Sequence, residues 1–276
     1  MATTPGVDYG YLRRLVHGHS QNVLDASRDY LFDSRLTRLL RNQGMSRLEE
    51  LVDRLRSRKD PALERAIAEA MTINETSFFR DNRPFELIRT DLLPKLIESR
   101  RTIRTLRFWS AACSTGQEAL SLAILLREHF PQLVNWRISI EGTDICAEAV
   151  RRAQEGRYHR IEVNRGLPAR FLVKYFDQEG DEWVAKEQVR ALCNFRQASL
   201  STPRLPFSRL DDRFDIIFLR NVMLYFSQET RNTLLKEVHR VTAGDGYLLL
   251  GSSEQPSDPS LWTPVLAGGT CYYRPK

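Results

Sequence analysis

The chain has 276 residues, of which 42% are hydrophobic, which is enough for one large domain or for a small domain joined to a medium one. Its net charge of +6 favours an acidic partner, but the 41 basic residues are interspersed with 35 acidic ones and form no long basic run, which argues against nucleic acid. No apolar run approaches 18 residues, and Met1–Gly6 lacks a charged segment followed by an apolar one. We therefore expect a cytoplasmic protein with neither a membrane span nor a signal peptide.

Cysteine and histidine spacing argues against disulfides and against a metal site. The cysteines form no CxxC pair, and the histidines form no HExxH motif. The four cysteines lie far apart, at Cys113, Cys146, Cys193 and Cys271. We expect no bound metal.

From Tyr9 to Met71 the apolar spacing is helical, as in Leu36, Leu39 and Leu40, and no strand is predicted there. The pattern predicts a small all-helical domain over residues 1–73. On one of its predicted helices, three basic residues share one side: Arg35, Arg38 and Arg41. Residues 74–104 then contain a distinct segment and a linking helix with apolar residues between Phe85 and Leu96.

After Arg104 short apolar runs alternate with helical patterns, which is typical of a mostly parallel sheet covered on both faces. The predicted strands are Thr105–Ser110, Arg137–Gly142, Ala191–Arg196, Phe214–Leu219 and Tyr247–Gly251. The predicted helices are Gln117–His129, Ala147–Gln154 and Gln228–Val241, the last with Ser227 as N-cap and Gly244 just beyond its end. The pattern of Thr263–Arg274 predicts a closing hairpin. That of residues 157–193 predicts irregular structure with brief strands.

Three blocks of sequence stand out: Asn74-Glu75-Thr76-Ser77-Phe78-Phe79-Arg80, then Phe108-Trp109-Ser110-Ala111-Ala112-Cys113-Ser114-Thr115-Gly116-Gln117-Glu118, and Arg220-Asn221-Val222-Met223-Leu224-Tyr225-Phe226. In this order they resemble the signature of the CheR family, methyltransferases that use S-adenosylmethionine to esterify glutamates on bacterial chemotaxis receptors. The resemblance runs from the first helix to the C-terminus.

The resemblance implies an α/β fold with a Rossmann-like class I methyltransferase sheet over residues 105–276. It also implies an all-helical N-terminal domain (1–73) that contacts the receptor, and a small antiparallel β subdomain inserted at 157–193. Two residues depart from the usual family pattern. Cys113 stands where alanine is usual, and Gln117 stands where glutamate is usual, which leaves Glu118 as the only carboxylate in that turn.

A site for S-adenosylmethionine needs hydrogen-bond acceptors and a close approach of the backbone, which strand ends of an α/β sheet supply. The turn at Ala112 to Gly116 precedes a helix with free N–H groups, although such a turn is often plain packing. Asp144 follows the second strand, where it can accept both ribose hydroxyls or cap the next helix. By analogy with the family, Glu118 meets the polar tail of the cofactor; otherwise it complements the helix dipole.

Further cofactor contacts are implied by the family positions. Ser199 and Leu200 correspond to residues that flank adenine, or else form a simple loop. Asn221 and Val222 close the fourth strand, where a polar residue is either part of a turn or aimed into the site. In the family, a segment folds over the cofactor as a lid, and here it contributes Asn74, Thr76 and Arg80. Phe78 and Phe79 are expected to anchor that lid in the core.

The reaction that the resemblance implies yields a glutamyl methyl ester and S-adenosylhomocysteine. A glutamate with a pKa of about 4.3 is already ionised near neutral pH, so no general base is required. Arg80 and Tyr225 are the residues we expect to hold the reacting carboxylate. The expected partner is the cytoplasmic helical region of methyl-accepting chemotaxis receptors. We expect the protein to be a monomer that is recruited to receptor arrays. Two alternatives are a non-catalytic receptor adaptor and a nucleic-acid methylase, and the latter is disfavoured because no Asn/Asp-Pro-Pro-Tyr motif follows the fourth strand.

Overall fold

A computed structural model of the protein describes residues 6–202, 204–205, 207 and 213–276. Residues 1–5, over which the sequence predicts no signal peptide, lie outside the described part. The chain divides into two compact units, one made of Met1–Ile73 and Tyr225–Arg231, the other of Asn74–Leu224 and Asn232–Lys276. No helix in the described ranges is long and apolar enough to span a membrane.

The first unit is helical, as predicted. It consists of α1 (Tyr9–Ser20), η1 (Ala26–Arg28), α2 (Tyr30–Arg35), α3 (Thr37–Asn42), α4 (Leu48–Ser57) and α5 (Pro61–Ala70). Their apolar faces share one buried cluster, in which Leu12, Phe32 and Leu51 are fully enclosed. Pro61 and Asp60 set the start of α5, because proline fits the first helical turn and the Asp60 carboxylate accepts from the Leu63 N–H group at 3.1 Å.

The single helix predicted to present Arg35, Arg38 and Arg41 on one side is wrong. The chain forms two helices there, α2 ending at Arg35 and α3 beginning at Thr37. The Arg35 guanidinium donates to the carbonyls of Met71 and Thr72 at 2.9 and 3.1 Å. These carbonyls follow α5, where the last turn of a helix leaves acceptors unpaired. Arg35 therefore stabilises the end of α5, whereas Arg38 and Arg41 are exposed.

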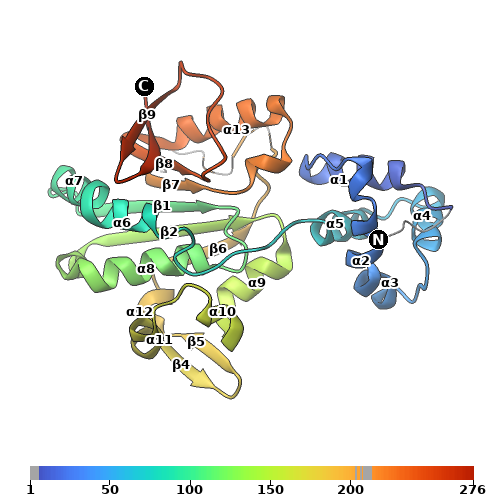
Figure 1. Cartoon of the computed structure of the whole chain (residues 1–276), viewed down its shortest axis with the longest axis horizontal. Coiled ribbons are helices and arrows are strands. Elements are labelled where there is room, and N and C mark those ends of the chain that lie inside the picture. The colour runs from blue at the N-terminus through green and yellow to red at the C-terminus, as the bar shows by residue number, and fades with distance from the viewer. Residues whose placement is uncertain (1–5, 203, 206, 208–212) are drawn as a thin grey trace. The chain divides into compact units, whose positions relative to one another are not determined.

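The second unit is built on a seven-stranded sheet in the order β6-β2-β1-β7-β8-β10-β9 (Figure 1). The strands are β1 (Thr105–Ala111), β2 (Arg137–Asp144), β6 (Cys193–Gln197), β7 (Phe214–Leu219), β8 (Thr242–Leu250), β9 (Trp262–Ala267) and β10 (Thr270–Pro275). The first five are parallel, and β10 pairs antiparallel with both β8 and β9. The expected Rossmann-like sheet and its closing hairpin are confirmed.

Helices cover both faces of this sheet (Figure 1). They are α6 (Arg83–Leu87), η2 (Ile88–Leu92), α7 (Leu93–Ser99), α8 (Gln117–His129), η3 (Pro131–Asn135), α9 (Ala147–Glu155) and α13 (Gln228–Val241). The 3-10 turn η5 (Met223–Tyr225) lies between β7 and α13. The first six contribute to one large cluster with Leu106 and Phe108 of β1, while α13 lies across the sheet from α8. The predicted bounds of α8 and α13 are those observed.

Two strands begin at other residues than predicted: β6 begins later in the chain, and β8 begins earlier. β6 begins at Cys193 rather than Ala191, because α12 (Glu187–Arg190) occupies the preceding residues. β8 begins at Thr242, directly after α13, so Gly244 lies inside the strand instead of ending the helix. The pairing of β7 with β8 shifts register between Phe214 and Ile216, which accommodates the added residues.

Residues 157–193 contain the small antiparallel sheet that the resemblance implied. Its strands β3 (Arg157–His159), β4 (Phe176–Glu179) and β5 (Glu182–Ala185) lie in the order β3-β5-β4. The short helices α10 (Arg160–Asn164) and α11 (Ala169–Tyr175) connect β3 to β4. Tyr158 and Phe176 join this sheet to the main hydrophobic cluster, so the two sheets share one core.

The strand order fixes where a ligand can bind. β1 lies between β2 and β7, so the chain leaves β1 toward one side of the sheet and returns through β7 on the other. At such a switch point the loops after the two strands diverge and leave a crevice at their carboxyl ends. The register aligns Ala111 with Leu219, which puts the loops that follow them at the same edge.

Candidate active site

The turn after β1 is tightly constrained. Ala112, Ser114 and Gly116 all have positive φ angles, of 60°, 50° and 93°. A Cβ on Gly116 would lie 2.9 Å from the Ala153 Cβ atom and 3.1 Å from Phe195 Cζ. Glycine is required here because the turn packs closely on α9 and β6. Close packing alone is therefore enough to explain Gly116. Contact of Ala112 or Gly116 with a cofactor stays a prediction.

Asp144, at the end of β2, braces this turn. One carboxylate oxygen accepts from the Ser114 N–H group at 2.8 Å, and the other accepts from the Cys146 N–H group at 2.9 Å. The side chain is mostly buried, and the N-cap of α9 is Cys146, so Asp144 is not itself the cap residue. The Ser114 hydroxyl donates to the Asn74 carbonyl at 2.8 Å. Ser114 therefore connects two predicted binding residues from segments far apart in the sequence.

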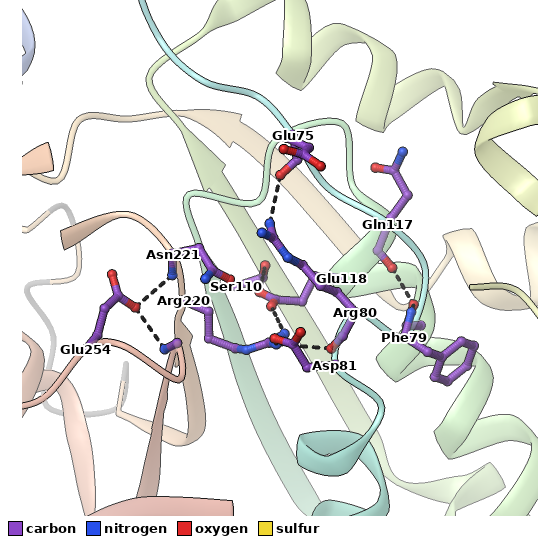
Figure 2. Close-up of polar contacts among 12 residues, drawn as sticks. Glu75, Phe79, Arg80, Asp81, Ser110, Gln117, Glu118, Arg220, Asn221 and Glu254 are labelled. Carbon is purple, nitrogen blue, oxygen red and sulfur yellow. Dashed lines mark hydrogen bonds and ion pairs between the residues drawn. The ribbon is translucent and has the colours of Figure 1, made fainter. Parts of the chain in front are cut away.

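Arg220 is the buried centre of an ion-pair network at the ends of β1 and β7. Its guanidinium donates to Glu118 at 2.9 Å, to Asp81 at 2.5 Å and to the Arg80 carbonyl at 3.0 Å (Figure 2). The second Glu118 oxygen accepts from the Ser110 hydroxyl at 2.7 Å. Both oxygens of Glu118 thus contact protein groups, and the side chain that we expected at the cofactor's polar tail is also part of this network.

One feature of the network fits a further polar ligand. The Arg220 side chain is 2% exposed, and its Nε atom has no hydrogen-bond partner among the described residues. A buried N–H group without a partner is costly and uncommon.

Glu254 organises the loop after β7. Its carboxylate accepts from four backbone N–H groups, those of Asn221, Val222, Met223 and Gly251, at 2.7 to 2.9 Å. Asn221 has a φ of 58°, and a Cβ on Gly251 would lie 2.6 Å from Glu254 Oε2. Figure 2 shows Glu254 facing Asn221 across this loop. The loop is therefore preformed, and its residues reach the same sheet edge as the turn after β1.

Residues 74–82, here called the cover segment, contact both the turn after β1 and Arg220 at the end of β7. Phe78 is fully buried, and the Phe79 N–H group donates to the Ser121 hydroxyl of α8 at 2.9 Å. The expectation that these two residues anchor the segment is confirmed for Phe78; Phe79 is half-buried and packs edge-on against Phe85. The Arg80 guanidinium donates to the Glu75 carbonyl at 2.9 Å.

A pocket of about 330 Å³ opens beside the cover segment. It is lined by residues 74–76, by the first residues of α8 and α9, and by α10. Of the predicted cofactor residues, Asn74 and Thr76 belong to this lining, and Gln117 contributes from α8. The volume lies within the range that small-molecule sites occupy.

The remaining predicted residues make contacts of their own. The Ser199 hydroxyl lies 2.6 Å from the Ser201 hydroxyl, and Leu200 is buried, both in the loop after β6. Tyr225 is grouped with the helical unit, where its carbonyl accepts from the Val23 N–H group at 2.8 Å. Its pairing with Arg80 on a substrate carboxylate stays a prediction.

The environment of Cys113 does not favour reactive chemistry. Burial raises the pKa of the Cys113 thiol well above its ordinary value, so it remains protonated within the turn. Across the described ranges, no group of three or more His, Cys, Asp or Glu residues is placed to hold a metal ion.

Sequence reasoning missed Ser114, Asp81, Arg220 and Glu254 as parts of the site. Arg220 offered a signal, because a charged residue directly follows the fully buried strand β7. Asp81 follows the first sequence block immediately. For Glu254 we find no local signal, since its partners come from loops on either side.

Comparisons with known proteins show the family of this chain. A family model described as the CheR methyltransferase SAM binding domain matches residues 74–267, and one described as the CheR methyltransferase all-alpha domain matches residues 8–72. Chemotaxis protein methyltransferase 1 of Pseudomonas aeruginosa is 36% identical over 260 residues, which cover 92% of each chain. Chemotaxis protein methyltransferase Cher2 of Pseudomonas putida is 34% identical over 257 residues, 91% of each chain. A chemotaxis protein methyltransferase of Borreliella burgdorferi is 32% identical over 88% of this chain and 86% of that protein.

Proposed function

The chain belongs to the CheR methyltransferase family, and we propose that it transfers the methyl group of S-adenosylmethionine to glutamate side chains of chemotaxis receptors. The products are glutamyl methyl esters and S-adenosylhomocysteine. The observation that carries the proposal is the junction at Ser114, where the turn after β1, the carboxylate of Asp144 and the cover segment meet at the switch point of the sheet.

S-adenosylmethionine would be held by the residues of this crevice. Asp144 is suited to the ribose hydroxyls, because a carboxylate accepts two hydrogen bonds side by side. Asn221 and Val222 approach from β7, and Ser199 and Leu200 from β6, while Asn74 and Thr76 close over the top. When bound, the cofactor supplies a methyl group on a positively charged sulfur.

The protein's own residues position and desolvate the reacting glutamate. That carboxylate is ionised near pH 7, so no side chain has to remove a proton. An anion that attacks a cation loses charge on the way to the transition state and gains from leaving water. Arg80 and Tyr225 orient the carboxylate, and the cover segment excludes solvent. A tight ion pair with Arg80 would stabilise the ground state, so its role is to align the nucleophile rather than to neutralise it.

The domains divide this work. The helical domain (1–73) meets the cytoplasmic helical region of the receptor, residues 74–104 link it to the catalytic domain (105–276), and the antiparallel subdomain (157–193) is inserted in the latter. The enzyme acts as a monomer that is recruited to receptor arrays at the membrane. The acidic helices of a receptor suit the net charge of +6.

Transfer of a tritiated methyl group from labelled cofactor into receptors tests the proposal. We expect label on the receptor that mild base releases as methanol, because esters hydrolyse there and N-methyl groups do not. Label that resists base would point to an amino-group acceptor instead. Cofactor binding without any transfer to receptors would point to a non-catalytic adaptor.

A further inference from the structure

Tyr158, on β3 of the small sheet, contacts the turn after β1. Its side chain is fully buried, and its hydroxyl donates to the Thr115 carbonyl at 2.8 Å. Thr115 lies between Ser114 and Gly116, two of the residues with positive φ. Burial raises the pKa of the Tyr158 hydroxyl well above its ordinary value, so the group remains a donor at every pH where the protein works.

The ring of the same tyrosine holds the cover segment. It packs edge-on against Phe78, with ring centroids 5.1 Å apart and an interplanar angle of 77°. Phe176 of β4 also packs edge-on against Phe78, at 5.6 Å and 89°, and contacts the Tyr158 ring at 6.3 Å, so the three rings form one cluster. Edge-to-face pairs of this kind fix ring orientation as well as burying area. Tyr158 thus contacts both the turn and the segment that covers it.

Two neighbouring residues extend this attachment. Gly166, between α10 and α11, has a φ of 91°, and a Cβ there would overlap the Phe78 carbonyl oxygen. Arg165 forms an ion pair with Glu75, and this pairing lowers the pKa of the Glu75 carboxyl. The cover segment is therefore held at Glu75 and at Phe78 by residues on β3 and β4 and in the connection between these strands.

We propose that Tyr158 is a positioning residue for the cofactor, and that through it the small antiparallel sheet sets cofactor affinity. Tyr158 contacts both the turn of residues 112–116 and the cover segment. It thereby holds these two walls of the crevice at a fixed distance from each other. Tyr158 does not itself touch the reacting atoms. The inference rests on the proposed function, since it concerns the site assigned to S-adenosylmethionine.

The test compares Tyr158→Phe with Tyr175→Phe. Each substitution removes one buried hydroxyl from the same subdomain and keeps its ring, and the Tyr175 hydroxyl donates to Glu128 at 2.7 Å, on α8 rather than at the turn. We expect Tyr158→Phe to raise the Kd for S-adenosylhomocysteine about fivefold, as the loss of one buried hydrogen bond implies. Tyr175→Phe should leave that Kd unchanged. Calorimetric titration measures both.

Steady-state methylation separates positioning from general damage. Tyr158→Phe should raise the KM for S-adenosylmethionine by a similar factor and leave kcat at saturating cofactor within about twofold of wild type, because the reacting groups are intact. An unchanged Kd in Tyr158→Phe, or an equal rise in Tyr175→Phe, would overturn the inference while the proposed function stands. A wild-type protein that binds no S-adenosylhomocysteine would overturn the proposed function itself, and the inference with it.

Discussion

Single charged residues hold the loops of this site in shape. Glu254 gathers four N–H groups from two loops, and Arg220 joins Glu118, Asp81 and the Arg80 carbonyl. A buried charge is tolerated only where partners of this kind surround it. Both residues are structural in the described contacts, yet each fixes a loop that the proposed function requires at the crevice. Loss of either would therefore affect binding through the loop it organises.

Asp144 has two tasks that a substitution should expose together. Asp144→Ala removes the acceptors for the Ser114 and Cys146 N–H groups as well as the proposed ribose contact. A ligand that binds only the native state raises its stability, and the gain grows with the ratio of ligand concentration to Kd. We expect S-adenosylhomocysteine to raise the melting temperature of the wild type by several degrees and that of Asp144→Ala hardly at all.

Asp258→Ala is the matched control for this experiment. Asp258 is half-buried, and its carboxylate likewise accepts from a backbone N–H group, that of Ser260 at 2.8 Å. Its loss should leave the ligand-dependent rise intact. Equal stabilisation of Asp144→Ala and wild type in a thermal shift series would remove Asp144 from the cofactor site.

Arg80 and Tyr225 should matter for rate rather than for cofactor affinity. If both orient the reacting carboxylate, Arg80→Ala and Tyr225→Phe lower kcat by about 100-fold, because misplaced reactants lose the advantage of alignment. The Kd for S-adenosylhomocysteine should stay within about twofold. Calorimetry and methyl transfer on the same samples decide this. A residue whose substitution weakens cofactor binding as much as turnover belongs to the cofactor pocket instead.

At the scale of elements, the break between α2 and α3 changes which arginines can meet a receptor. Arg35 is committed to the end of α5, so Arg38 and Arg41 on α3 are the exposed charges that remain from the predicted basic face. Charges on a surface steer an acidic partner over a Debye length of about 8–10 Å at moderate ionic strength. If the helical domain meets the receptor as proposed, these two residues are available to its glutamates.

Charge reversal tests this role. The double variant Arg38→Glu, Arg41→Glu should raise the KM for receptor about tenfold and flatten its salt dependence, with the cofactor Kd unchanged. Arg101→Glu is the control, since Arg101 is an exposed arginine of the other unit. Steady-state methylation across a salt series provides the measurement. A receptor KM that does not differ from that of the control would make Arg38 and Arg41 ordinary surface charges.

At the scale of the whole molecule, one ion-pair group connects the segment that precedes β1 to the neighbouring strands β7 and β8. Arg100, after α7, donates to Asp215 of β7 at 2.9 Å and to Asp245 of β8 at 2.8 Å. Hydrogen bonding by Arg100 lowers the pKa of Asp245, whereas burial raises the pKa of Asp215. Ionisation of Asp245 therefore stabilises the folded state, whereas ionisation of Asp215 destabilises it.

The effect of low pH on the stability of the protein can be tested at Asp245. Because its pKa is lower in the folded state, its ionised form stabilises the protein above the unfolded pKa of about 3.9, and this contribution is lost as pH falls below that value. Asp245→Asn should therefore be less stable than wild type at pH 7, and the difference should shrink below about pH 4. Urea unfolding at both pH values measures it. A difference that grows on acidification would contradict the assignment.

The local sequence was sufficient for most elements of the fold. Periodic apolar residues and clear end signals gave the observed bounds of α8 and α13, and continuous apolar runs located the parallel strands. These signals act between residues a few positions apart, so they can be read without the fold. The three sequence blocks added the family and, through it, the small antiparallel sheet.

Only the tertiary structure decided which side chains meet. Arg220 pairs with Glu118 and Asp81, which are 102 and 139 residues away in the sequence, and Arg35 pairs with carbonyls 36 and 37 residues later. No local pattern encodes such partners, because they depend on which strands become neighbours and which loops share an edge of the sheet. The sequence by itself determined the elements and the family. The packing of the second unit decided that Tyr158, the turn after β1 and the cover segment form one assembly, since contact geometry exists only once the chain has folded.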